Sequence, residues 1–364
     1  MRPLKVLLTT AIAISILVML YVRLPRFGNL PGGIYLERIR HSLNYRSGMF
    51  HNIHDTQLPT SLPNIFRTMV DFFMKHKTCE HIPSIKTDLM NLGRNEDVLV
   101  WFGHSSYFIQ IDGKKILVDP IFSNVPSPLQ FLQFPKAFPG SNIYSTDDIP
   151  ELDYLFITHD HWDHLDYETV SNLREKIRRV ICPLGVGAHF DRWDFDPEII
   201  TEMDWNESTV IGEKFHIHCL PARHFSGRGF AKNKSLWASF LINTPSNFKI
   251  FFGGDGGYDT HFMRIGQLFN EINLVIMENG QYNENWRDIH MYPEETIRAT
   301  EDLRAEALLP VHLGKYSLST HPWNEPLERI YELSKGKKFR LLTPQIGQKV
   351  DLRNPNQTFS PWWK

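Results

Sequence analysis

Six consecutive residues near the middle of the chain carry three histidines and two aspartates. They read HDHWDH and occupy positions 159–164. The residues before them, 155–158, are apolar or β-branched and predict a short buried strand. In a locally extended chain His159 and His161 point to the same side, and Asp163 and His164 follow where the chain turns into a helix. This spacing predicts ligands for two adjacent metal ions better than for one.

Imidazole and carboxylate groups are ligands of zinc and of neighbouring transition metals. The segment contains no cysteine, which argues against a closed structural zinc site. The alternative is a polar surface loop that happens to be rich in histidine and aspartate. The narrow spacing and the polar residues further along the chain favour the metal site.

Three polar residues further along the chain each follow a predicted strand. His224 comes after a strand at 215–220, Asp255 after a strand at 249–252, and His312 after a strand at 307–311. Glycines on both sides of Asp255 let the backbone approach a ligand closely. Any one of these residues alone is more often structural. In sequence order behind the 159–164 segment, they become candidate metal ligands, because a metal site needs polar groups from several strand ends.

A pair of close metal ions suits hydrolysis. Such a pair shares and deprotonates a water near neutral pH, polarises a substrate oxygen and stabilises the leaving oxygen. No serine or cysteine nucleophile is then required, and the sequence contains no Gly-x-Ser-x-Gly elbow or comparable triad. We therefore expect a metal-dependent hydrolase.

The elements that must position these residues form two runs of strands, each followed by helices. This order predicts an α+β fold in which two mixed sheets face each other with helices outside. We assign the hydrolase domain to residues 95–350. Strands are expected at 98–102, 107–111, 115–119, 152–158, 180–183, 210–211, 215–220, 237–243, 249–252, 274–277 and 307–311, and helices at 166–178, 261–270, 293–303 and 326–333.

The composition is that of an ordinary globular protein. The chain of 364 residues is 42% apolar and 22% charged, with a formal net charge of −2, so no general attraction to nucleic acid is expected. Cys79, Cys182 and Cys219 are widely scattered and form neither a disulfide framework nor a Cys-x-x-Cys site. We expect them to be buried thiols.

The N-terminus differs from the rest of the chain. Residues 6–22 carry no charge, and this run is at the short end of what crosses a bilayer. A cleaved signal peptide is the alternative, but no small-x-small cleavage site follows the run. We predict a single-pass membrane anchor at 1–23 and a connecting arm at 24–94 with an amphipathic helix around 62–75. The excess of arginine after the run favours a catalytic domain on the cytoplasmic side.

The His-x-His-x-Asp-His spacing after a hydrophobic strand resembles the signature of the metallo-β-lactamase superfamily. The resemblance implies an αββα sandwich with a dinuclear metal site. Members that bind iron for redox work usually carry glutamate at the position of His161, so the resemblance favours two Zn²⁺ ions as cofactors. The implied ligands are His159, His161 and His224 for the first metal, Asp163, His164 and His312 for the second, and Asp255 as the bridge between them.

A wider resemblance, from about residue 98 to 333, is carried by WFGHSS at 101–106, LVDPIFS at 117–123, PARHFSGR at 221–228 and SLWAS at 235–239. These segments are similar to the N-acyl-phosphatidylethanolamine-hydrolysing phospholipase D group. That group cuts a membrane phosphodiester to give an N-acylethanolamine and phosphatidic acid, so the resemblance implies a membrane phospholipid as substrate. The chain departs from the group at Gly256, where threonine is usual, and before residue 95.

His290 lies just before a helix that Pro293 starts well. The phospholipase D group carries a histidine at this loop position, facing the metals. An imidazole there is suited to donate a proton near the phosphoryl or leaving oxygen as charge develops. The alternative is a structural histidine at the helix entry. We predict that His290 and the metal-binding Asp163 both act in catalysis.

Other functions remain open at this point. A lactonase-like hydrolase of a sugar or cell-envelope metabolite would use the same fold and metals. A non-catalytic scaffold usually loses ligands, whereas all seven are present. A nuclease of the superfamily usually has a large additional domain and a basic surface, so no nucleic-acid partner is expected. The sequence predicts neither the residues that bind substrate nor the oligomeric state, for which a homodimer is left open.

Overall fold

The computed structural model describes residues 2–57, 81–212 and 214–364, without the side chains of residues 2–4. The helix expected around 62–75 and Cys79 lie outside the described residues. Cys182 and Cys219 are buried free thiols, as expected.

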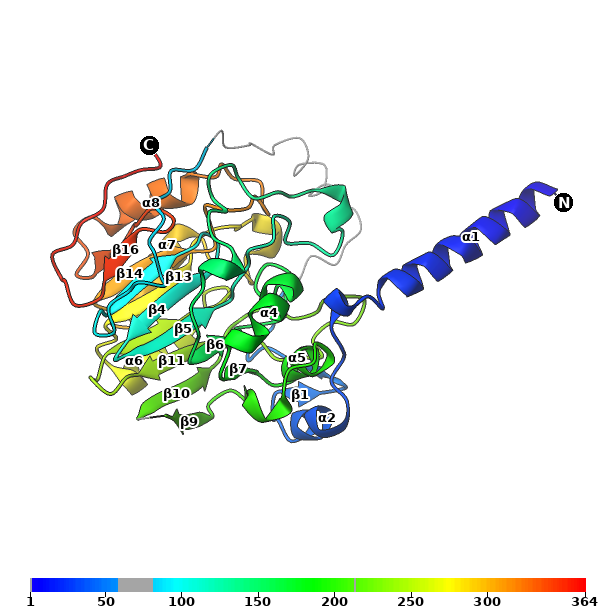
Figure 1. The fold of residues 1–364 in the computed structure, drawn as a ribbon, viewed down its shortest axis with the longest axis horizontal. Coiled ribbons are helices and arrows are strands. Elements are labelled where there is room, and N and C mark those ends of the chain that lie inside the picture. Colours follow the sequence, from blue (N-terminus) through cyan, green and yellow to red (C-terminus); the bar gives the residue numbers. More distant parts are fainter. Residues whose placement is uncertain (1, 58–80, 213) are drawn as a thin grey trace.

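Two mixed seven-stranded sheets form the centre of the described part of the chain (Figure 1). Each sheet has an antiparallel half and a parallel half. The first sheet has the strand order β16 (Lys349–Asp351), β3 (Val98–Trp101), β4 (Tyr107–Ile111), β5 (Lys114–Val118), β6 (Tyr154–Phe156), β7 (Val180–Pro183) and β8 (Ile200–Met203). The second has the order β15 (Arg340–Leu341), β14 (Ala307–Val311), β13 (Leu274–Glu278), β12 (Lys249–Phe252), β11 (Ser239–Asn243), β10 (Phe215–Leu220) and β9 (Ser208–Ile211).

The main core lies between the inner faces of the two sheets. The ring of Phe156 lies 5.4 Å from that of Phe240 and 5.3 Å from that of Phe252, measured between centroids. Each of these side chains is fully buried. Aromatic pairs at this spacing and tilt add to the stabilisation that comes from removing their area from water.

Helices cover the outer faces of the sheets. Leu173 and Phe190 pack with the outer face of the first sheet, and Phe262, Ile297 and Ile330 pack with that of the second. The layers are therefore helix, sheet, sheet and helix, which confirms the αββα prediction. The helices involved are α4 (Tyr167–Leu173) and α5 (Gly187–Arg192) on the first sheet, and α6 (His261–Phe269), α7 (Pro293–Asp302) and α8 (Glu325–Ser334) on the second.

The expected elements are confirmed, with small shifts at their ends. The helix expected at 166–178 ends earlier, because α4 tightens into a 3₁₀ turn at Arg174–Lys176. Sequence reasoning missed several short elements, namely α2 (Gly33–Arg40), α5, β1 (Tyr45–Arg46), β2 (Met49–Phe50) and the edge strands β8, β15 and β16. Five further short 3₁₀ helices are described: η1 (Pro25–Phe27), η2 (Gln130–Leu132), η3 (Thr146–Asp148), η5 (Pro197–Ile199) and η6 (Glu284–Trp286).

The N-terminal segment begins with helix α1 (Arg2–Tyr21), which extends away from the sheets in Figure 1. Helix α2 (Gly33–Arg40) and the small hairpin of β1 (Tyr45–Arg46) and β2 (Met49–Phe50) follow it. Ile39 and Phe50 are fully buried in the main core.

The structure does not support the predicted transmembrane anchor. Among the described residues, no helix combines the length and the apolar character needed to cross a membrane.

Candidate metal centre

Three imidazoles meet just beyond the end of β6. The Nε2 atoms of His159 and His224 lie 2.9 Å and 3.1 Å from Nδ1 of His161. His224 donates from Nδ1 to the carbonyl of Ile289, so its Nε2 presents a lone pair to His161. One proton on His161 Nδ1 cannot satisfy two such neighbours, whereas a metal ion accepts lone pairs from all three rings.

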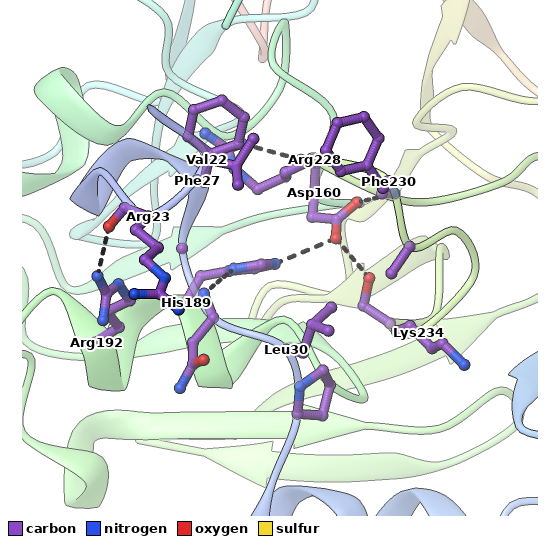
Figure 2. A pocket seen from close by; sticks show the side chains of 17 residues that line it. Val22, Arg23, Phe27, Leu30, Asp160, His189, Arg192, Arg228, Phe230 and Lys234 are labelled. Carbon is purple, nitrogen blue, oxygen red and sulfur yellow. Dashed lines mark hydrogen bonds and ion pairs between the residues drawn. The ribbon is translucent and has the colours of Figure 1, made fainter. Parts of the chain in front are cut away.

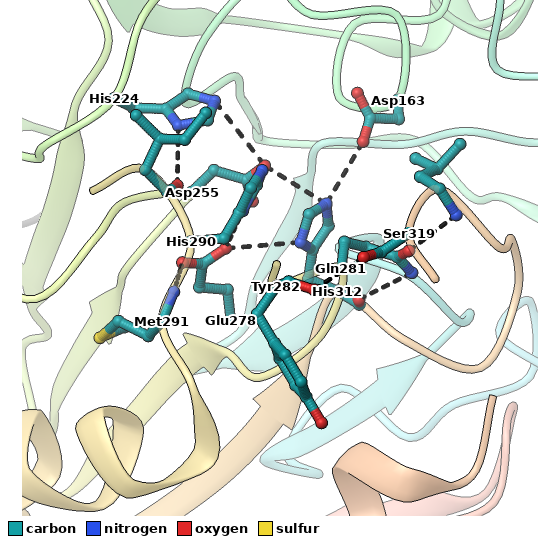
Figure 3. Close-up of polar contacts among 12 residues, drawn as sticks. Asp163, His224, Asp255, Glu278, Gln281, Tyr282, His290, Met291, His312 and Ser319 are labelled. Atoms are coloured by element: carbon teal, nitrogen blue, oxygen red, sulfur yellow. Dashed lines mark hydrogen bonds and ion pairs between the residues drawn. The ribbon is translucent and has the colours of Figure 1, made fainter. Parts of the chain in front are cut away.

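A second group of side chains gathers around Asp163, as Figure 3 shows in part (Figure 3). Its Oδ2 atom lies 2.9 Å from Nε2 of His104, 3.3 Å from Nε2 of His312 and 3.8 Å from Nε2 of His164. The ligand atoms of these four residues lie within 4.8 Å of one another.

Asp255 lies between the two groups. Its Oδ2 atom is 3.1 Å from Nε2 of His164, 3.3 Å from Nε2 of His312 and 3.9 Å from Nε2 of His224. The structure thus brings all seven sequence-predicted ligands together, and it divides them as the resemblance implies. Their binding of metal stays a prediction.

The backbone around Asp255 holds its carboxylate close to both neighbouring loops. A Cβ atom at Gly257 would lie 2.1 Å from the carbonyl oxygen of Asp288, so a side chain has no room there. At Gly256 the corresponding contact is 3.1 Å, to the backbone nitrogen of Arg223. The Asp255 loop is therefore packed between the segments that carry His224 and His290.

The electrostatics of the two groups differ. Burial lowers the pKa of His161 to about 4, and it lowers the pKa of His159 well below the usual value. Both rings are neutral at neutral pH, which is the form that binds metal. Burial acts in the same direction on His312, but Asp255 and Asp163 outweigh it and raise its pKa to about 10. The two carboxylates of Asp163 and Asp255 therefore stabilise a positive charge at the second group, which either a proton or a metal ion can supply.

The donor set fits a pair of divalent cations. Buried atoms without a hydrogen-bond partner include Nε2 of His161, Nε2 of His164 and Oδ1 of Asp255. His164 donates from Nδ1 to Asp119, so in its neutral form an acceptor nitrogen faces the acceptor oxygen of Asp255. Nitrogen and oxygen ligands without thiolates are typical of catalytic rather than structural zinc sites.

Asp119 positions the second group through a hydrogen bond to His164. Its carboxylate accepts hydrogen bonds from His164 Nδ1 at 2.8 Å and from the backbone and hydroxyl of Thr158 at 2.8 Å and 2.6 Å. Such partners fix the tautomer and the orientation of a metal-binding histidine. Asp119 follows β5, so it occupies the same kind of strand-end position as the predicted ligands.

A short backbone bridge joins the two sheets beside the site. The amide of His104 donates to the carbonyl of Leu313 at 2.8 Å, and the amide of His312 donates to the carbonyl of His104 at 3.0 Å. His104 and His312 have φ angles of 51° and 63°, a left-handed conformation that few non-glycine residues adopt. The bridge fixes the distance between a segment of the first sheet and a ligand of the second.

His290 lies beside Asp255 and His312, and its Nδ1 donates to Oε2 of Glu278 at 2.6 Å (Figure 3). Its role in catalysis stays a prediction. Its Nε2 atom, on the far side of the ring, is then the nitrogen that remains for a substrate. Glu278 is fully buried, accepts from the backbone of Met291 and lies 3.4 Å from Nδ1 of His312.

Sequence reasoning missed His104, Asp119 and Glu278. The signal was available, because Asp119 and Glu278 end or follow predicted strands and His104 lies in one of the segments that carry the resemblance. Nothing in the local sequence distinguishes these supporting roles from ordinary buried polar residues.

A cavity of about 250 Å³ opens onto the metal centre. Apolar side chains line part of it, and the exposed Lys232 stands at its edge. The apolar lining residues are Phe225, Trp286, Ile289 and Leu318. The cavity thus combines a polar floor with an apolar wall and one free cation among its described lining residues.

Comparison with known proteins agrees with this geometry. Residues 114–313 match the family model described as the beta-lactamase superfamily domain. The chain belongs to the metallo-β-lactamase superfamily. It is 36% identical over 331 residues to a functionally uncharacterised protein of Mycobacterium tuberculosis, a match that covers 89% of this chain and 88% of the relative.

A second relative and a solved structure add to the comparison. The chain is 31% identical over 264 residues to a mitochondrial N-acyl-phosphatidylethanolamine-hydrolysing phospholipase D of Saccharomyces cerevisiae, covering 68% of this chain and 54% of the yeast protein. A metallo hydrolase of Ignicoccus hospitalis has the same fold, with a TM-score of 0.52, 18% identity, and coverage of 70% of this chain and 98% of that one. The protein is a metal-dependent hydrolase of this superfamily.

Proposed function

We propose that the protein is a dinuclear zinc phosphodiesterase of the phospholipase D type, acting on N-acyl-phosphatidylethanolamine-like phospholipids. The observation that carries the proposal is the Asp255 carboxylate between two nitrogen-rich groups at the floor of a cavity with an apolar wall. The similarity to the yeast phospholipase D supports the choice of substrate.

The reaction is the hydrolysis of the phosphodiester on its head-group side. A water oxygen forms a bond to phosphorus, the bond from phosphorus to the ethanolamide oxygen breaks, and that oxygen leaves with a proton. When bound, the metal pair supplies a hydroxide near neutral pH and positive charge for the phosphoryl oxygens. The products are an N-acylethanolamine and phosphatidic acid.

The residues of the chain provide orientation and protons. Glu278 accepts a hydrogen bond from His290 Nδ1. In the imidazolium form of His290, Nε2 also carries a proton and donates it to the leaving oxygen. Lys232 at the edge of the cavity pairs with the phosphate charge, and Phe225 and Trp286 contact the apolar part of the substrate. Asp163, which also lines the cavity, orients the attacking water through its carboxylate.

Membrane association through helix α1 is part of the proposal. Its apolar side chains are exposed: Leu7 and Leu17 have 69% and 65% of their surface accessible. Removing this apolar surface from water favours association with a bilayer. We propose that the catalytic domain lies on the cytoplasmic side, in keeping with the arginines that follow the helix.

Two experiments test the proposal. Product analysis with zinc-loaded protein on a panel of phosphodiesters and lactones should give N-acylethanolamine and phosphatidic acid from the lipid. Efficient turnover of lactones without turnover of lipid phosphodiesters would establish the lactonase alternative.

Deleting residues 1–23 should release a folded, metal-loaded enzyme from membranes, since no predicted ligand lies there, and unchanged membrane binding would refute the role of α1.

A further inference from the structure

A second cavity, of about 390 Å³, lies behind the 159–164 segment, on the side of Asp160 (Figure 2). Asp160 separates the two ligands His159 and His161 in sequence. Three further segments line the cavity: residues 22–31, the end of α5, and residues 227–235. None of the seven predicted ligands is among its lining residues.

The charged residues of the lining are mostly cations. Arg23, Arg192, Arg228 and Lys234 face one carboxylate, that of Asp160. Asp160 already accepts hydrogen bonds from Ser235, from the amide of Gly227 and from His189, so its charge is compensated locally.

Two of the cations are exposed and form no ion pair with any described residue. Arg23 and Arg192 are exposed and lie side by side in Figure 2, where Arg192 donates to the carbonyl of Arg23 at 2.9 Å. Among the described residues, no carboxylate forms an ion pair with either of them. Two adjacent guanidinium groups without a partner favour an anion with several acceptor oxygens.

An apolar groove of about 650 Å³ adjoins this cavity. Val22, Phe27 and Arg228 line both spaces, so the two lie next to each other. The groove is formed by the end of α1, the loop before and within η2, and residues 229–230. Its exposed apolar side chains include Leu17, Leu129, Phe131 and Phe230, the last with 83% of its surface accessible.

We propose that these two spaces together bind one anionic phospholipid of a bilayer. Its phosphate lies between Arg23 and Arg192, and one acyl chain lies in the groove against Phe131 and Phe230. Charge complementarity selects this occupant, because a free phosphate leaves the apolar groove exposed and a neutral lipid leaves the two arginines unmatched. The inference rests on the membrane association proposed above, but not on the proposed substrate.

The site is connected to the metal centre by direct contacts. Arg228 stacks on Trp162 at 4.1 Å and donates to the carbonyls of Asp160 and Leu165 at 2.9 Å and 2.6 Å. A bound lipid touches both Arg228 and Trp162, and therefore steadies the backbone that carries the predicted ligands. The segment from Phe225 to Lys232 separates the lipid from the metal cavity and holds that cavity at the bilayer surface.

The test is flotation of the full-length, metal-loaded protein with vesicles, in the absence of any substrate. Vesicles of phosphatidylcholine that contain phosphatidylglycerol should bind the protein more tightly than pure phosphatidylcholine vesicles. Phosphatidylglycerol is neither the proposed substrate nor its product, so a failure of the proposed phosphodiesterase activity leaves this result unaffected. Equal binding to both vesicles would overturn the proposal.

Charge-removing variants locate the site. Arg23→Gln combined with Arg192→Gln should weaken binding to anionic vesicles about thirtyfold, the effect expected for two surface cations. The matched control is Arg94→Gln with Arg264→Gln, two exposed arginines outside both spaces, and it should bind like the unaltered protein. If the control loses as much affinity, the attraction is general and the site is refuted.

The apolar half and the source of the anion are tested separately. Phe131→Ser with Phe230→Ser should weaken binding to anionic vesicles, whereas Leu268→Ser, at an exposed leucine of α6, should not. Unchanged metal content and Tm in each variant show that the fold is intact.

An excess of inorganic phosphate should leave vesicle binding unchanged, and displacement by phosphate would assign the cavity to a free anion instead.

Discussion

The two sheets supply the metal centre in different ways. The first contributes four predicted ligands from the single loop after β6, where consecutive residues determine the spacing. The second contributes His224, Asp255 and His312 from the ends of three different strands. One half is therefore set by local chain geometry, and the other by the packing of a whole sheet.

This difference explains how much of the site could be predicted. The 159–164 loop is recognisable because all its chemistry lies within six positions. The distributed ligands were identified only because each follows a strand in the expected order. The supporting residues act through contacts with other side chains, and no spacing in the sequence predicts such contacts. These residues are His104, Asp119 and Glu278.

The largest expected effect comes from removing one ligand of each half. Asp255→Ala and His159→Ala should each abolish nearly all hydrolysis, because either substitution removes a predicted ligand that holds the metals in place. Elemental analysis should find two metals per chain in the unaltered protein. His216→Ala, an exposed histidine on β10, serves as the control and should keep both metals. One metal or none in an active preparation would contradict the dinuclear centre.

A smaller effect is expected at His290, which belongs to the distributed half without being a predicted ligand. His290→Ala should keep both metals and the fold but lower turnover roughly a hundredfold, the low end of general acid–base effects. Measurement of kcat alongside metal content separates the possibilities. A drop in metal content would make His290 a ligand or its support, and unchanged turnover would make it structural.

The local half depends on Asp119, and its substitution tests that dependence. Asp119→Asn keeps the size of the side chain but weakens the hydrogen bonds to His164 and Thr158. Metal affinity should fall by about tenfold to hundredfold, as for other partners of metal-binding histidines. Competition with a chelator measures this change. If affinity is unaltered, the loop positions His164 without help from Asp119.

A different kind of effect concerns stability at the edge of the first sheet, away from the metals. Burial raises the pKa of Glu202 to about 7 in the folded protein, although two backbone amides donate to it. The folded state therefore binds this proton more tightly than the unfolded chain does, and the resulting stability is lost as pH rises from about 4.5 through 7. Glu202→Gln should increase the free energy of unfolding by about 3 kcal/mol at pH 8. Thermal melts at pH 4 should show little gain, and a gain that does not change with pH would contradict this account.

The fold was predicted more completely than the site because its signals are periodic. Strands such as Tyr107–Ile111 and Phe215–Leu220 were predicted residue by residue, since long apolar runs bounded by turns specify them. The edge strands β8, β15 and β16 were missed, because short edge strands contribute few buried residues to a pattern. The apolar N-terminal run predicted a membrane span, and no described helix meets the length and hydropathy of one.

The backbone bridge between His104 and His312 is a direct main-chain link between the two sheets. Two sheets that meet only through side chains are free to slide when the core expands on warming. Here a pair of peptide hydrogen bonds pins them together beside the metals. The main chain, and not side-chain packing alone, therefore sets the distance between His104 and His312, both of which approach Asp163.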